Sequence, residues 1–157
     1  MINDKIMPED DMPEGKAIGP KDDNLSELPS YRIVEGTSPA LEFECPADCK
    51  IIAAKGAFLA KAPHIAVSPV GDIDGFDSYE NKSNETEILY LSPSSTGSLI
   101  AFDMQLHQKG LIISAASLFA LTQHVDWTAV LDLSLEGING RYRLFQTKGE
   151  GVVVAFM

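Results

Sequence analysis

The sequence IIAAKGAFLAKAPHIAV at residues 51–67 recurs in altered form as LIISAASLFALTQHVDW at residues 111–127. This alignment sets position 51 against position 111, and it matches His64 with His124. Both copies consist of short apolar runs separated by small or turn-forming residues, which favours a strand–turn–strand element. The chain therefore contains an internal repeat, and two such units packed face to face would bury a shared core.

A second match relates Gly97–Phe102 to Gly151–Phe156, and it sets the two copies closer together along the chain than the first match does. The difference predicts a longer connection in the first copy. We place that connection in the polar stretch Val70–Thr86, which is rich in Gly, Asn, Ser and Asp. Phe102 and Phe156 match across the repeat and suit symmetric core packing, and we expect Phe58 in the core as well.

Outside the repeat, apolar and polar residues alternate with period two, the spacing at which side chains point to opposite faces of a sheet. This alternation predicts strands at Leu41–Cys45 and Leu131–Glu136, with an Asn-Gly turn at Gly137–Gly140 leading into a partner strand from Tyr142. Ser114–Val130 competes as a helix, but its Thr, Val and Trp residues favour strands. Short unalternated runs suit strands buried on both faces, and these are Ile51–Ala54, Leu111–Ile113 and Val152–Phe156.

These patterns predict an all-β fold, a β-sandwich or barrel made of two internally duplicated halves. We expect a single domain over residues 30–157, with halves of about 31–105 and 106–157. Residues 1–29 carry eight acidic residues and four prolines without a periodic apolar face, so we expect a flexible, disordered acidic tail.

Composition narrows the classes of function. The chain has 157 residues, 23 acidic and 12 basic, which gives a formal net charge of −11. That charge disfavours binding to nucleic acid or to an anionic membrane surface. No apolar run reaches the roughly 20 residues that span a bilayer, so we expect no membrane insertion and a cytoplasmic location.

Four motifs in order resemble a known family. They are EGTSPAL at residues 35–41, IAAKGA at 52–57, GLIISAASLFA at 110–120 and RLFQTKGEGV at 143–152. Together they resemble the altered-inheritance-of-mitochondria protein twenty-four family, a mitochondrial biogenesis family, over Tyr31–Met157. The resemblance implies a double-layered β-fold similar to the tryptophan RNA-binding attenuation protein (TRAP-like) and homo-oligomeric assembly. It supplies no catalytic residue.

The residues that bear chemistry form no recognisable catalytic set, so we predict no catalytic, cofactor-binding or metal-binding residue and no cofactor. His64 and His124 are weak candidates for imidazole ligands of a metal, because the repeat makes them equivalent. A zinc or iron site needs at least one further ligand at a fixed spacing from them, and the sequence shows none. Arg141 and Arg143 are weak candidates for docking an acidic segment. Cys45 is in phase with apolar neighbours and is predicted to be a buried thiol.

We therefore expect a non-enzymatic, homo-oligomeric binding or scaffolding protein with a protein partner. The alternative is a small-molecule-binding or metal-dependent β-sandwich enzyme with His64 or His124 near its pocket. RNA binding by analogy with the attenuation protein is disfavoured by the net charge.

Overall fold

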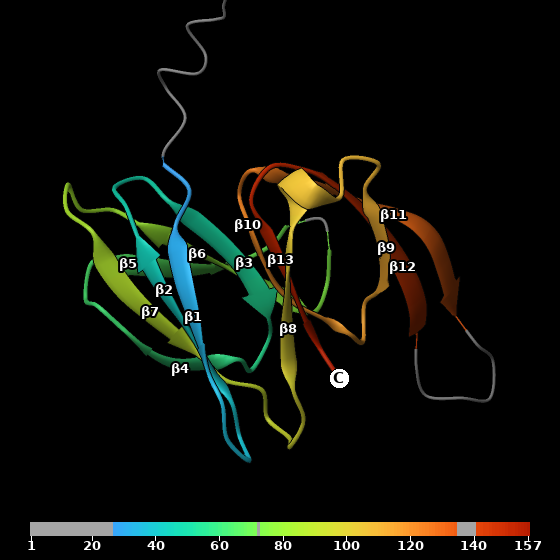
Figure 1. Ribbon diagram of the computed structural model, residues 1–157, viewed down its shortest axis with the longest axis horizontal. Coiled ribbons are helices and arrows are strands. Elements are labelled where there is room, and N and C mark those ends of the chain that lie inside the picture. The colour runs from blue at the N-terminus through green and yellow to red at the C-terminus, as the bar shows by residue number, and fades with distance from the viewer. Residues whose placement is uncertain (1–26, 72, 135–140) are drawn as a thin grey trace, which may run out of the picture.

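The computed structural model describes residues 27–71, 73–134 and 141–157 (Figure 1). The predicted tail lies outside the described residues up to position 26, as does the predicted Asn-Gly turn. The described residues form strands and one short 3₁₀ turn, so the all-β prediction is confirmed. In chain order they are β1 (Ser30–Val34), β2 (Ala40–Cys45), β3 (Lys50–Ala54), β4 (Phe58–Lys61), β5 (Ile65–Pro69), β6 (Phe76–Asn81), β7 (Glu87–Leu91), β8 (Leu99–Asp103), η2 (Met104–Leu106), β9 (Leu111–Ser114), β10 (Leu118–Thr122), β11 (Val125–Ser134), β12 (Arg141–Gly149) and β13 (Val152–Phe156).

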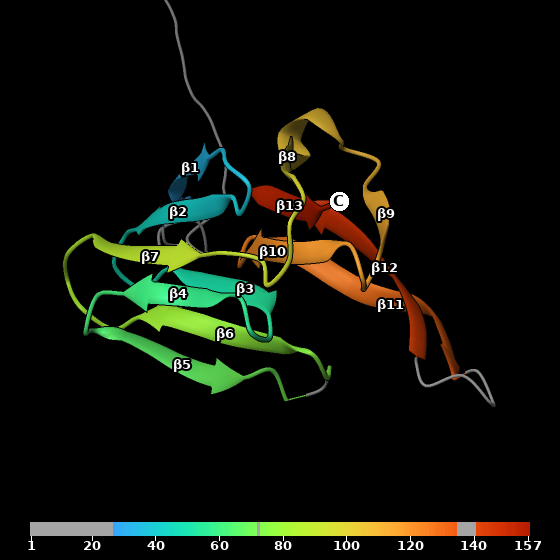
Figure 2. The same ribbon diagram turned by 90° about the horizontal axis from the view of Figure 1, so that it is seen from below.

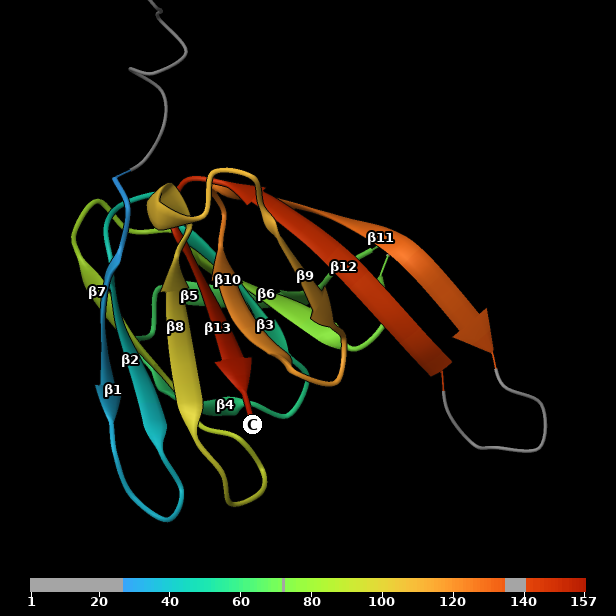
Figure 3. The same ribbon diagram turned by 45° about the vertical axis from the view of Figure 1, so that its right-hand side comes forward.

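The strands make three antiparallel sheets. Their orders are β1-β2-β7-β4, β5-β6-β3-β10-β13-β8 and β11-β12-β9. The long β11–β12 hairpin projects from the body of the molecule (Figure 3). In the described part of the chain, no helix has the length and apolar character to span a bilayer.

Strand pairing repeats along the chain. In the first unit, which runs from β2 to β7, strand β7 lies between β2 and β4, and β6 lies between β5 and β3. In the second unit, which runs from β8 to β13, strand β13 lies between β8 and β10, and β12 lies between β11 and β9. The β4–β7 pairing slips at Leu59 and the β10–β13 pairing slips at Phe119, which are matched positions of the repeat. Two units of like topology are thus joined in one chain, the first on the left and the second on the right in Figures 1 and 2.

The turns of the repeat also close with equivalent hydrogen bonds. The Ala57 amide donates to the Ala54 carbonyl at 3.1 Å after β3, and the Ser117 amide donates to the Ser114 carbonyl at 3.0 Å after β9. Both bonds close a four-residue turn between two strands. The predicted repeat of residues 51–67 at 111–127 is therefore present as the same strand–turn–strand element.

The second sequence match, of Gly97–Phe102 with Gly151–Phe156, is wrong. The Ser92 amide donates to the Ala57 carbonyl and the Phe156 amide donates to the Ser117 carbonyl, each at 2.8 Å, which makes the end of β7 equivalent to the end of β13. Strand β8, which we had matched with β13, is instead its hydrogen-bonded neighbour. We propose that the halves divide between β7 and β8 and not near residue 105.

The segment Val70–Thr86 is also more than a connection. It contains β6, whose Phe76 and Tyr79 are 3% and 2% exposed. Strand β6 occupies in the first unit the place of β12 in the second. Its Asp77, Ser78 and Glu80 are half-buried, and they give the segment its polar composition.

The core consists of two clusters that join the sheets. One contains Leu41, Phe43 and Tyr79, and the other contains Phe76 and Phe145. Two predictions of burial are wrong, because they fall on strands at the edge of a sheet. Strand β9 exposes 66% of Ile112, and β4 exposes 50% of Phe58.

Candidate functional site

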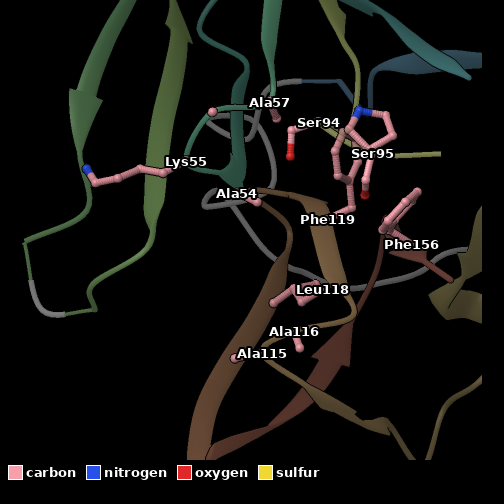
Figure 4. Close-up of a pocket in the computed structure, with 12 residues that line it drawn as sticks. Ala54, Lys55, Ala57, Ser94, Ser95, Ala115, Ala116, Leu118, Phe119 and Phe156 are labelled. Carbon is pink, nitrogen blue, oxygen red and sulfur yellow. The ribbon is translucent and has the colours of Figure 1, made fainter. Parts of the chain in front are cut away.

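A pocket of about 260 Å³ lies where equivalent turns of the two units meet (Figure 4). The turn Ala54–Ala57 contributes one wall and Ala115–Leu118 contributes another. The loop Pro93–Ser95, between β7 and β8, contributes to the lining together with Phe119 and Phe156. The pocket stays open because the turns carry alanine and glycine, which have little or no side chain to fill it.

The side chains that line the pocket are mostly small or apolar, while polar atoms of the backbone and the serines form about as much of its surface. The hydroxyl groups of Ser94 and Ser95 stand among alanines and the Phe119 and Phe156 rings (Figure 4). The Lys55 side chain extends away from the pocket, and its Nζ lies 3.1 Å from Asp77 Oδ1. Such a lining suits a small neutral ligand that buries apolar surface and accepts or donates hydrogen bonds at the serines.

The two histidines occupy equivalent turns, one before β5 and the other before β11. His64 is largely exposed, and its Nδ1 lies 3.1 Å from Glu87 Oε1. The His124 carbonyl accepts the Glu150 amide at 3.2 Å. Among the described residues, no group of three or more His, Cys, Asp and Glu is placed to hold a metal ion. Neither histidine lines the pocket between the turns.

The two candidate arginines begin β12. Arg143 Nη2 donates to the Asp74 carbonyl at 2.9 Å, and its guanidinium carbon lies 5.6 Å from the centre of the Phe145 ring. These contacts bind Arg143 to the connection before β6 and give it a cation–π contact. The side chain of Arg141 lies outside the described residues.

The cysteines are free and buried, as predicted for Cys45. They lie at the ends of the β2–β3 turn, where the Cys49 amide donates to the Pro46 carbonyl at 3.1 Å. The hydrogen bond between the two thiols lowers the pKa of Cys45, and the same bond with burial raises the pKa of Cys49. Nucleophilic attack requires an accessible thiolate, and burial of both sulfurs opposes it.

A polar cluster that sequence patterns missed lies across β1, β2 and β7. Glu42 accepts hydrogen bonds from Tyr90 Oη at 2.8 Å and from Arg32 Nε at 2.9 Å. These two bonds lower the pKa of the Glu42 carboxyl, and Glu42 in turn raises the pKa of Tyr90. The three residues come from strands far apart in the sequence, so only the strand order reveals the cluster.

Fold and site define an all-β protein of two like units, with a small pocket where the turns of both units meet. The chain belongs to the family described as "Mitochondrial biogenesis AIM24", whose model matches residues 31–157. No curated protein matches the sequence.

Among solved structures, the crystal structure of protein SPYM3_0169 from Streptococcus pyogenes is similar, with a TM-score of 0.63 and 14% sequence identity. The match covers 82% of this chain and 64% of that one, so this chain spans less than two thirds of its neighbour. At this identity the likeness concerns the fold alone. The similarity to the attenuation-protein fold stays a prediction.

Proposed function

We propose that this protein is a non-enzymatic binding or scaffolding protein that works as a homo-oligomer. The observation that carries the proposal is the exposure of large apolar side chains along strands of the sheet edges and the projecting hairpin. Uncovered apolar groups of this kind mark surfaces where another chain packs. They are Phe58, Leu59, Ile112, Val130, Leu131 and Tyr142.

Two further features belong to the same proposal. A net charge of −11 supports a protein partner over nucleic acid, because phosphate backbones repel an acidic chain. We keep the cytoplasm as the proposed location, with a role related to the biogenesis function for which the family is described.

Light scattering tests the assembly directly. We expect the full-length protein, and a variant lacking residues 1–29, to show a mass well above the 17.0 kDa of one chain. Equal oligomers in both samples would place the contacts in the folded part. A monomer in both samples over the whole accessible concentration range would remove the main support for a scaffold.

A second candidate is a small-molecule-binding or metal-dependent enzyme, and the pocket between the turns supports its small-molecule-binding form. Elemental analysis of the purified protein discriminates the two. Stoichiometric zinc, iron or manganese would support the enzyme and overturn the scaffold, whereas a metal-free protein whose thermal unfolding is unchanged by small-molecule libraries would support the scaffold.

A further inference from the structure

Strands β4 and β10 hold the same position in the two units but have different neighbours. β10 pairs with β13 on one side and with β3 on the other, and all of its residues are buried. Within the described residues, β4 pairs with β7 alone and ends its sheet. Its Phe58, Leu59 and Ala60 are exposed. The second unit thus has a covered edge where the first has an open one.

The reverse holds for β3 and β9. β3 pairs with β6 and also with β10, and its central Ile52 is 9% exposed. β9 pairs with β12 and ends its sheet, and the equivalent Ile112 is 66% exposed. Each chain therefore contains one β3–β10 pairing and, at the strands equivalent to this pair, two open edges. The open edge at β9 is equivalent to β3, and the open edge at β4 is equivalent to β10.

The internal junction specifies how the open edges would fit. In the β3–β10 pairing, Ile52 faces Leu121. In the alignment of the repeat, Ile52 matches Ile112 on β9, and Leu121 matches Lys61 on β4. In Figures 1 and 2, β4 lies in the left half and β9 in the right half, so the two open edges lie on different sides of the molecule.

We propose that β9 of one copy pairs antiparallel with β4 of a second copy of this chain, in the register of the internal β3–β10 junction. This inference rests on the proposed homo-oligomer and names the strands through which it forms. The pairing joins β11-β12-β9 of one copy to β4-β7-β2-β1 of the next. Because the two edges differ, the contact is head to tail, and its repetition builds a ring when the rotation closes.

The chemistry of the edges fits this occupant. Neither β4 (FLAK) nor β9 (LIIS) contains a proline, so backbone donors and acceptors are available for a ladder. Covering Phe58, Leu59 and Ile112 removes exposed apolar surface from water. Lys61 is the charged residue of these strands, and its apolar stem can lie over Ile112 while the ammonium stays in water.

Charge substitutions at the facing pair test both the strands and the register. Ile112→Lys places like charges directly opposite each other, so we expect about tenfold weaker association. Ile112→Glu places a carboxylate opposite Lys61 and should retain the oligomer. Adding Lys61→Glu to Ile112→Lys should restore it. Leu106→Lys, at a side chain 79% exposed on η2, is the matched control and should associate like the wild type.

Light scattering and sedimentation over a dilution series measure these four variants beside the wild type. Loss in Ile112→Lys with recovery in the double variant supports the β9–β4 contact. An oligomer that persists unchanged in Ile112→Lys overturns this contact while the scaffold proposal stands. A wild-type protein that is monomeric at every concentration overturns both, and circular dichroism of each variant shows that the fold is intact.

Discussion

Asn81, at the end of β6, is a buried polar side chain of the core with several hydrogen bonds. Its Nδ2 donates to the carbonyls of Cys45, Pro46 and Glu85 at 2.9, 3.1 and 2.7 Å, and its Oδ1 accepts from Ser83. The residue is 1% exposed, so these partners replace water entirely. One amide thus ties the β2–β3 turn to the loop after β6.

Asn81→Asp tests this assignment. An ionised carboxylate would face three carbonyl oxygens, so we expect a loss of about 3 kcal/mol or more in the free energy of unfolding at neutral pH. Burial among oxygens raises the pKa of the new carboxyl, so the deficit should shrink as the pH falls toward about 4 and the neutral acid donates one bond.

Urea unfolding at several pH values measures this deficit. Ser83→Ala, which removes one partner of Asn81 at a less buried position, is the control and should cost about 1 kcal/mol. A pH-independent deficit below about 1 kcal/mol in Asn81→Asp would contradict the role assigned to the amide.

At the scale of elements, the sequence patterns located most strands correctly but misjudged their surroundings. The run Leu111–Ile113 is as apolar as Ile51–Ala54, yet β9 is an edge strand and β3 is central. The apolar composition of a strand shows that it can be buried, but whether it is buried depends on which strands pair beside it. The pocket could not be predicted from the sequence for the same reason, because its walls come from turns in different units of the chain.

The equivalent bulge residues Leu59 and Phe119 turn this difference into a prediction. Phe119 is 4% exposed and Leu59 is 56% exposed. We expect Phe119→Ala to lower the free energy of unfolding by about 3–5 kcal/mol, because it leaves a cavity in the core. Leu59→Ala should cost about 0.5 kcal/mol or less when measured at low concentration.

Denaturation at two protein concentrations separates these effects. If β4 binds a second copy, the cost of Leu59→Ala rises with concentration while that of Phe119→Ala does not. Equal costs for the two alanine variants in dilute solution would contradict the described burial of β10 and exposure of β4.

For the whole molecule, the six-stranded sheet contains strands of both units, joined at β3 and β10. A shared sheet links the stability of the units, so we expect one cooperative unfolding transition. The single Trp127 reports on the second unit, and the buried Cys45 and Cys49 report on the first.

Fluorescence and thiol labelling along the same urea series compare the two units. We expect the tryptophan signal and the exposure of the thiols to share one midpoint. Thiols that react at a lower urea concentration than the fluorescence change would show that the first unit opens independently.

The sequence by itself determined the all-β class, most strand positions and the repeat of residues 51–67 at 111–127, because alternation and turn chemistry are local properties. The tertiary structure alone decided the partners of each strand, the equivalence of β7 with β13 and the open edges at β4 and β9. It also assembled the pocket and the Glu42 cluster. These features depend on contacts between residues far apart in the chain, and two copies of one pattern become buried or exposed according to what pairs beside them.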